Sequence, residues 1–310
     1  MIRDYVNMAR PDHWFKNAFM LPGILIAWVA SPPEQPLSTL GWIGLGVIAA
    51  CLACSSNYTI NEWLDAPEDK LHPEKKSRPA AAGRVKARIV YFEWAFLAAS
   101  ALTLAWFVGL MFLLSLLMLL VMGLLYNVRP VRLKDIPYLD VLSEGVNNPL
   151  RLLLGWYAVG SQLVPPASLL LAYWMLGAFL MAIKRLAEMR HLGDRAVAMA
   201  YRQSFRHYTA ERLLVSIVFY ASAFAFFAGV FLIRYRVELI LGVPFLAGFM
   251  AMYLRVGFLP DSPARRPEHL YKDRNLMIYI VLAVLALVVC MWIRMPWLNA
   301  LFQPTIPAGL

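Results

Sequence analysis

The fold is decided by residues 38–69, which read STLGWIGLGVIAACLACSSNYTINEWLDAPED. This stretch opens as an apolar segment long enough to cross a bilayer and closes on a polar run with Asn61, Asp65 and Asp69. These three residues recur every four positions, so on a helix they project from successive turns of one face. Mg²⁺ is usually held by one or two carboxylates together with substrate phosphates. The motif therefore predicts a magnesium site that binds a diphosphate substrate.

A basic segment follows this acidic face. Lys75 and Arg78 come shortly after the motif, so acidic side chains are followed by basic side chains where the chain leaves the apolar segment. Pro67 lies within the motif, and proline lacks an amide donor and disfavours helix at the preceding residue. The sequence leaves open whether the helix continues, or kinks or ends near Ala66 and so places Asp69 on a turn.

The composition places the motif in a membrane protein. Of the 310 residues, 61% are hydrophobic and only 15% are charged, which is too apolar for a soluble chain. Segments of about 20 apolar residues, the length that crosses the hydrocarbon core, predict nine transmembrane helices, with eight as the alternative. They lie at residues 19–31, 38–60, 88–107, 110–126, 138–158, 167–189, 211–232, 237–256 and 276–295. We therefore predict an all-α, polytopic membrane protein that forms a single domain over residues 1–310.

The placement of charge predicts the orientation in the membrane. Lys and Arg concentrate at the amino terminus and in alternate loops, at residues 70–86, 129–134, 190–206 and 255–274. Segments 32–37 and 159–166, on the opposite side, contain neither. The positive-inside rule then places the amino terminus in the cytoplasm and predicts helices around a cytoplasm-facing polar cavity in the cell (inner) membrane. The net charge of +10 follows from this topology, so nucleic-acid binding is not expected.

Ionisable residues close to a bilayer are costly, so their concentration at several helix ends on one side predicts a functional site. A transporter that uses these charges as an ion path is one alternative. A transporter predicts charges through the depth of the membrane, and Arg151, within the span at 138–158, is an exception to the one-sided pattern. The one-sided pattern as a whole favours an enzyme.

The motif resembles the first signature of the UbiA superfamily of intramembrane transferases, an Asn/Asp-x-x-x-Asp-x-x-x-Asp pattern after the second helix. The matching residues are Asn61, Asp65 and Asp69, followed by Arg78-Pro79 and Gly83. Glu62 stands where many members have Asp. The resemblance implies a nine-helix fold in which Asn61, Asp65 and Asp69 are catalytic residues. It assigns the two aspartates to Mg²⁺ and Asn61 to Mg²⁺ or the diphosphate.

Four further segments are similar to one branch of the superfamily, the polyprenyl-phosphate phosphoribosyltransferases. They are residues 10–17 (RPDHWFKN), 126–140 (YNVRPVRLKDIPYLD), 184–188 (KRLAE) and 267–273 (PEHLYKD). Residues 147–151 (NNPLR) depart from the patterns of that branch, and the roles of Asn147, Asn148 and Arg151 stay open.

The region after helix six distinguishes this branch from ordinary prenyltransferases. Those enzymes resemble one another in carrying a second aspartate pair there, which binds a second Mg²⁺. The charged residues there are Lys184, Arg185, Glu188, Arg190, Asp194 and Arg195. Cations outnumber acids, which suits additional phosphate groups better than a second metal. The resemblance thus implies transfer of 5-phosphoribosyl from phosphoribosyl diphosphate to a polyprenyl phosphate, with release of diphosphate. Transfer of an isoprenoid from a prenyl diphosphate to an aromatic or lipid acceptor is the alternative.

The resemblance also implies a set of substrate-binding residues. They are Lys16, Asn17, Lys75, Arg78, Tyr126, Lys134, Asp140, Lys184, Arg185 and Glu188. Lys184 and Arg185 would position the acceptor phosphate. Asp140 and Glu188 would bind ribose hydroxyls or, alternatively, pair with nearby Arg. The length of the lipid and the oligomeric state are not fixed by the sequence.

Overall fold

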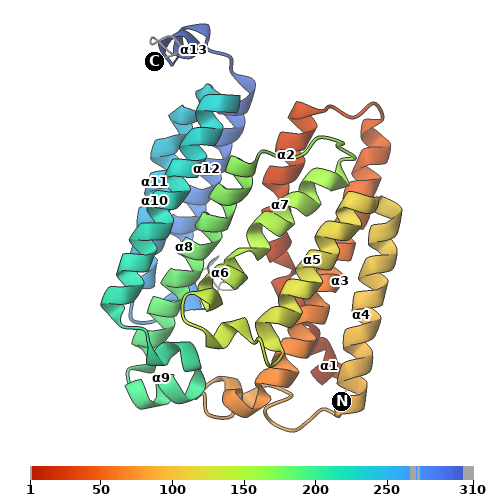
Figure 1. The fold of residues 1–310 in the computed structure, drawn as a ribbon, viewed down its shortest axis with the longest axis vertical. Coiled ribbons are helices and arrows are strands. Elements are labelled where there is room, and N and C mark those ends of the chain that lie inside the picture. Colours follow the sequence, from red (N-terminus) through yellow and green to blue (C-terminus); the bar gives the residue numbers. More distant parts are fainter. Residues whose placement is uncertain (1, 266–269, 271–272, 303–310) are drawn as a thin grey trace. The chain divides into compact units, whose positions relative to one another are not determined.

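The computed structural model describes residues 2–265, 270 and 273–302, and its regular elements over these residues are all helices (Figure 1). Among these described residues, seven helical segments are long and apolar enough to cross a membrane. They are Pro36–Asp69 (α3), Ala87–Val108 (α4), Leu110–Asn127 (α5), Ala167–Leu192 (α8), Ala210–Tyr235 (α10), Val237–Gly257 (η5 and α11) and Arg274–Trp292 (α12). The all-α class and the membrane-spanning character predicted from the sequence are confirmed.

The other two predicted spans are interrupted. The span at 19–31 is a 3₁₀ helix, Pro11–Met20 (η1), followed by the short helix Leu21–Ala30 (α2). The span at 138–158 is divided into Leu139–Gly145 (α6) and Asn147–Ala158 (α7). Pro149 explains this division, because it has no N–H to donate to the carbonyl of Gly145. The count of nine spans stays a prediction.

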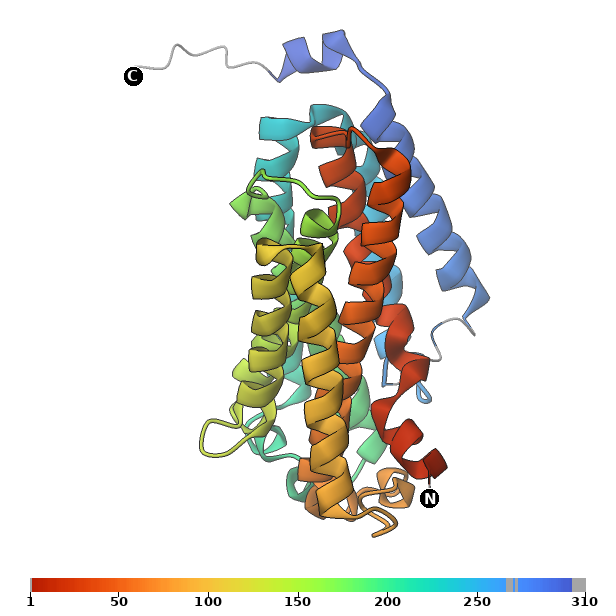
Figure 2. The same cartoon turned by 90° about the vertical axis from the view of Figure 1, so that its right-hand side faces the viewer.

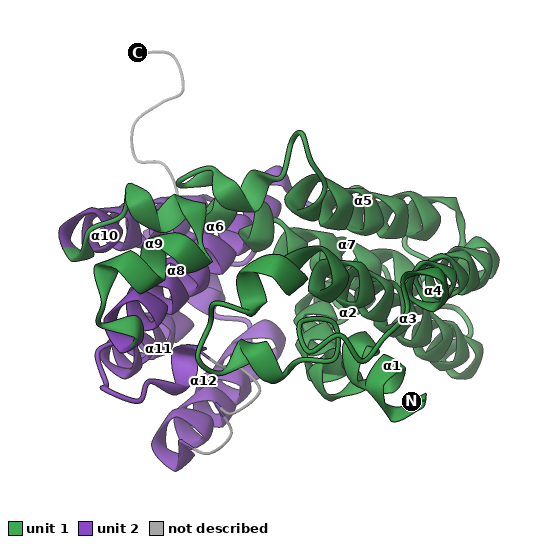
Figure 3. Cartoon of the chain, turned by 90° about the horizontal axis from the view of Figure 1, so that it is seen from below, with its two compact units in different colours: residues 1–165, 192–210 green, residues 166–191, 211–310 purple. Residues whose placement is uncertain are grey.

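The chain forms two compact units, which are described separately (Figure 3). The first contains residues 1–165 and 192–210, and the second contains residues 166–191 and 211–310. The organisation of the chain as a single domain stays a prediction.

In the first unit, α3 packs along α4 and α5, and α7 packs against α2, α3 and α5 (Figure 1). Their buried interface contains many small residues, such as Ala49, Ala53 and Ala101. Small side chains allow helices in a membrane to approach closely. The helix α7 lies close to both η1 and α2. A Cβ added at Gly155 would lie 2.0 Å from the carbonyl oxygen of Met20 in η1, and one added at Gly23 of α2 would lie 2.1 Å from that of Leu152.

The length of α3 places the polar motif beyond the apolar part of the bundle. The helix has 34 residues. At a rise of about 1.5 Å per residue it is about 51 Å long, whereas the hydrocarbon core of a bilayer is about 30 Å thick. Its last turns, which carry residues 61–69, therefore extend toward the membrane surface.

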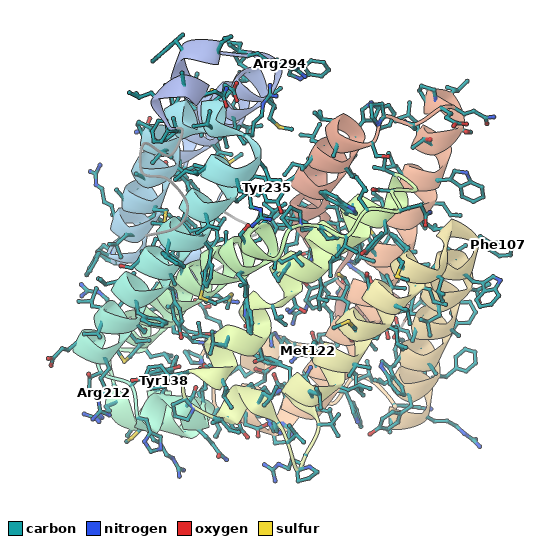
Figure 4. All side chains as sticks on the ribbon, turned by 45° about the horizontal axis from the view of Figure 1, so that its top comes forward. Phe107, Met122, Tyr138, Arg212, Tyr235 and Arg294 are labelled. Carbon is teal, nitrogen blue, oxygen red and sulfur yellow. The ribbon has the colours of Figure 1, made fainter. Side chains whose placement is uncertain are left out.

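The outer side of α4 carries large apolar side chains. Phe92 is 70% exposed and Phe107 is 62% exposed, and Figure 4 shows Phe107 directed away from the other helices of its unit. Aromatic side chains exposed to this extent along a whole helix are expected to contact lipid.

In the second unit, α11 (Val243–Gly257) packs against α12 and against η5 (Val237–Gly242). The buried Glu238 of η5 accepts hydrogen bonds from Met295 N at 3.2 Å and from Asn299 Nδ2 at 3.0 Å. These bonds hold the short helix Pro296–Leu301 (α13), which turns away from the end of α12 (Figure 2).

Candidate active site

The polar end of α3 is the centre of the candidate site. The helix runs through Pro67 and ends at Asp69, so Asp69 lies in the last turn of the helix. Pro67 removes only the hydrogen bond to the carbonyl of Trp63, while Lys70 N still donates to Ala66 O at 3.3 Å. The motif is therefore helical over its whole length, which answers the question that the sequence left open.

Asp65 is held by basic side chains from the segment that follows α5. Lys134 Nζ donates to Asp65 Oδ1, and Arg132 Nη2 lies 3.2 Å from the same oxygen. Arg132 also forms ion pairs with Glu68 at 2.9 Å and with Asp135 at 3.2 Å. Burial lowers the pKa of Lys134, although the attraction of the Asp65 carboxylate opposes this shift. The predicted residues Asp65 and Lys134 are thus brought together.

Asp69 forms a second acid–base pair with the loop after α3. Its Oδ2 lies 2.6 Å from Arg78 Nη1, and the Asp69 side chain is only 1% exposed. Burial tends to lower the pKa of Arg78, but Asp69, together with Tyr201 and Glu62, raises this pKa above its ordinary value. Lys75, in the same loop, donates to the hydroxyl of Tyr201 in the helix Arg195–Tyr201 (α9). The loop thus brings one predicted phosphate ligand, Arg78, directly onto the motif.

Asn61 contacts a residue to which the sequence alone assigns no role. Its Nδ2 donates to Oδ1 of Asn127, the last residue of α5, and the same oxygen accepts a hydrogen bond from Lys134 Nζ at 2.8 Å. Asn127 is 3% exposed. A polar amide at the end of an apolar helix, a few residues before Lys134, is the signal that could have identified it. Arg132 was also missed, although it lies within the segment that resembles the phosphoribosyltransferase branch.

The amino-terminal pair of predicted residues lies in η1. Lys16 Nζ is 5.4 Å from the ring centroid of Tyr58 on α3, a cation–π contact. Asn17 Oδ1 accepts a hydrogen bond from Arg151 Nε at 3.2 Å, and Asn17 Nδ2 lies 3.2 Å from Cys51 Sγ. The amide of Asn17 therefore joins η1 to α3 and α7. Its role in substrate binding stays a prediction.

Tyr126 and Asp140 lie in a neighbouring hydrogen-bond network of the first unit. Tyr126 OH donates to Glu144 Oε2 at 3.1 Å. Asp140 is fully buried, and it accepts hydrogen bonds from Tyr208 OH at 2.5 Å and Ser204 Oγ at 3.1 Å. Arg202 lies 3.6 Å from the carboxylate of Asp140, which agrees with the structural alternative for this residue. A ribose hydroxyl would have to replace one of these partners.

The remaining predicted residues, Lys184, Arg185 and Glu188, lie on α8 in the second unit. Arg185 is 1% exposed, and its Nη1 lies 3.1 Å from Glu188 Oε2. Pairing of Glu188 with an arginine, the structural alternative, is thus observed. Pro267 and Glu268, part of the last segment that resembles the phosphoribosyltransferases, lie outside the described residues.

The donor set at the end of α3 fits a hard cation. Within the described ranges, no three or more His, Cys, Asp or Glu side chains form a metal cluster. Two carboxylates and an amide are a smaller set, but Mg²⁺ takes its remaining ligands from water and substrate phosphates. Lys134 and Arg78 place a positive charge on Asp65 and Asp69, and Glu68 Oε2 is buried without a hydrogen-bond partner among the described residues. The site thus has oxygens for a cation and basic groups for phosphates.

Comparisons with known proteins find similar sequences and similar folds. The model of the UbiA prenyltransferase family matches residues 19–272. A decaprenyl-phosphate phosphoribosyltransferase of Mycolicibacterium smegmatis is 28% identical over 213 residues, which are 69% of this chain and 65% of that protein. A protein of the same name from Mycobacterium tuberculosis (strain H37Rv) is 29% identical over 213 residues, 69% of this chain and 68% of that protein. The matched region thus spans about two thirds of each relative.

Solved structures share the fold. A UbiA homolog from Archaeoglobus fulgidus bound to GPP and Mg²⁺ is similar with a TM-score of 0.69 and 19% identity, over 92% of this chain and 99% of that chain. A structure described as digeranylgeranylglyceryl phosphate synthase has a TM-score of 0.64 and 16% identity, over 94% of this chain and 98% of that chain. At these identities the likeness concerns the fold alone.

Proposed function

Because the chain belongs to the UbiA prenyltransferase family of membrane transferases, we propose that it transfers 5-phosphoribosyl from phosphoribosyl diphosphate to a polyprenyl phosphate. Diphosphate is released, and the reaction depends on Mg²⁺. The names of the two mycobacterial relatives support this choice of donor and acceptor. The excess of Lys and Arg in alternate loops supports a site that opens to the cytoplasm, where a water-soluble donor is available.

The observation that carries the proposal is the chemistry of the end of α8. A second aspartate pair for a prenyl diphosphate would be expected there, but Asp194 is the only aspartate between residues 184 and 195. Its carboxylate caps α9, accepting a hydrogen bond from Ala196 N at 2.7 Å. Lys184 and Arg185 remain in this region and would bind phosphate groups. The 5-phosphate of the donor and the phosphate of the acceptor would supply the ligands for such groups.

The donor diphosphate would bind at the end of α3. Asp65 and Asp69 would hold Mg²⁺ together with Asn61, and the metal would neutralise the charge that builds on the leaving diphosphate. Arg78 and Lys134, which lie on the two carboxylates, would then hold diphosphate oxygens.

The ribose would react at its anomeric carbon through a state with oxocarbenium character. The acceptor phosphate is already an anion near neutral pH, so no strong base is needed. Lys184 and Arg185 would position it, and correct orientation would supply much of the rate enhancement.

The proposal is tested with the full chain purified in detergent, supplied with Mg²⁺, polyprenyl phosphate and either labelled phosphoribosyl diphosphate or labelled prenyl diphosphate. We expect label from phosphoribosyl diphosphate in the lipid phase, and no such label with Asp65→Ala. Prenyl transfer, the activity in the name of the family, is the rival function. Turnover of the prenyl diphosphate alone would overturn the proposal.

A further inference from the structure

We infer that Asn127 is a positioning residue for the site at the end of α3: it orients Asn61 toward the metal and keeps Lys134 beside it. This inference rests on the proposed magnesium site. Asn127 does not touch the metal or the substrate in this scheme. It acts through its two partners: Asn61 would hold the metal, and Lys134 would bind an oxygen of the diphosphate.

The orientation of the Asn127 amide follows from its partners. Its Nδ2 donates to Gly123 O, one turn earlier in α5, at 2.8 Å. A backbone carbonyl only accepts hydrogen bonds, so the nitrogen of the amide must face Gly123. The oxygen then faces Lys134 Nζ, 2.8 Å away, and an ammonium group only donates. Two contacts on opposite sides of the amide therefore require the same orientation.

This orientation determines that of Asn61. Because Asn127 presents an oxygen, Asn61 must present its Nδ2 to it, as observed. The carbonyl oxygen of Asn61 is the one atom of this amide that can ligate a cation. Because the amide nitrogen is bonded to Asn127, this oxygen is not used in that bond and stays available to a cation. If Asn127 were absent, the Asn61 amide could rotate and direct its NH₂ group at the cation.

The same oxygen fixes Lys134. The Lys134 ammonium is shared between Asp65 and Asn127. A cation on Asp65 would repel this ammonium, and the bond to Asn127 would keep it near the site, available to a diphosphate oxygen. Residues that orient metal ligands in this way typically contribute about 10-fold to 100-fold in metal affinity.

Asn57 provides a matched control. It lies one turn before Asn61 on α3, and its Nδ2 donates to Leu119 O of α5 at 3.0 Å. Like Asn127, it therefore forms a hydrogen bond to a backbone carbonyl of α5. The one hydrogen bond that the structure gives the Asn57 side chain among the described residues is this bond to backbone, and it joins no carboxylate of the motif. Asn57→Ala removes a comparable bond between helices without changing the partners of Asn61.

The test measures Mn²⁺ binding by electron paramagnetic resonance, with inorganic diphosphate present and the full chain in detergent. We expect Asn127→Ala to weaken Mn²⁺ binding by about 10-fold, and Asn57→Ala to change it less than about 2-fold. We expect Asn127→Ala to have a smaller effect in an Asn61→Ala background than in the wild type, because Asn127 acts partly through Asn61 and partly through Lys134. Asn127→Asp keeps an acceptor oxygen but cannot donate to Gly123, and it should restore binding to within about 3-fold of wild type.

The outcomes separate this inference from the proposed function. Equal Mn²⁺ affinity in Asn127→Ala and Asn57→Ala would overturn the role of Asn127 alone. Loss of binding in Asn127→Asp as large as in Asn127→Ala would also overturn it, because the bond to Gly123 would then be the important one. Absence of Mn²⁺ binding in the wild-type protein would overturn the magnesium site itself, and the inference with it.

Discussion

The ion pair between Asp65 and Lys134 gives the most detailed prediction. The side chain of Lys134 is 4% exposed and that of Asp65 is 19% exposed. Removal of one partner from a buried ion pair costs about 3–5 kcal/mol, since it leaves a buried charge uncompensated. Asp65 is partly exposed, so we expect Asp65→Ala to lower the free energy of unfolding by about 3 kcal/mol, the lower end of that range.

Removal of the other partner, Lys134, is expected to lower the free energy of unfolding less than removal of Asp65. Lys134→Met removes the buried ammonium, and Asp65 keeps Arg132 at 3.2 Å as a partner, so we expect a loss of about 1–2 kcal/mol. The double variant has neither charge. Its loss should therefore be smaller than the sum of the two single losses, by about 1–2 kcal/mol.

The assay is unfolding of the purified protein by sodium dodecyl sulfate in mixed micelles, followed by tryptophan fluorescence. Arg84→Ala is the matched control, because it breaks an ion pair with Asp4 in which the two atoms lie 3.0 Å apart. In this pair the Arg84 side chain is 47% exposed and that of Asp4 is 20% exposed. Water screens an exposed pair, so this variant should change stability little. Losses from Asp65→Ala and Lys134→Met that add to within about 0.5 kcal/mol would refute the reasoning, since independent sites are additive to that extent.

Three further predictions concern the site and the packing. Asp69→Asn should lower the initial rate of transfer at saturating Mg²⁺ by about 100-fold or more, because a metal supplies several kcal/mol of charge stabilisation; a wild-type rate would contradict the assignment. Gly155→Ala places a methyl group 2.0 Å from Met20 O and should cost about 1–3 kcal/mol in unfolding measurements, whereas Gly41→Ala, with nothing within 4 Å, should be neutral. Burial lowers the pKa of Lys134, so between that pKa and 10.5 the unfolded chain binds more protons and stability rises with pH. This rise should be absent in Lys134→Met.

Much of the fold follows from local sequence. Apolar runs bounded by charged or turn residues predicted the helices Ala87–Val108 and Leu110–Asn127 to within one residue at each end. The spacing of Asn61, Asp65 and Asp69 predicted a shared helical face, because periodicity depends only on neighbouring turns, but the effect of Pro67 on the last turn could not be read from the spacing.

The residues that contact that face were harder to predict from the sequence. Asn61 and Asn127 are separated by 66 residues in the chain, and Asp65 and Lys134 by 69. Local spacing does not encode such contacts, which arise only when α3 and α5 pack together. The interruption at Val146 was missed for a related reason: the apolar run at 138–158 continues through it, while the backbone bonds lost at Pro149 do not affect hydropathy.

The central claim is that the lipid product carries a phosphoribosyl group. Mass spectrometry of the lipid fraction, after reaction of the purified protein with Mg²⁺, polyprenyl phosphate and phosphoribosyl diphosphate, tests it most directly. We expect the lipid to gain the mass of one 5-phosphoribosyl unit and one diphosphate to be released for each product formed. An unchanged lipid in the presence of a protein that binds Mn²⁺ and diphosphate, or a product that contains an added isoprenoid, would contradict the account.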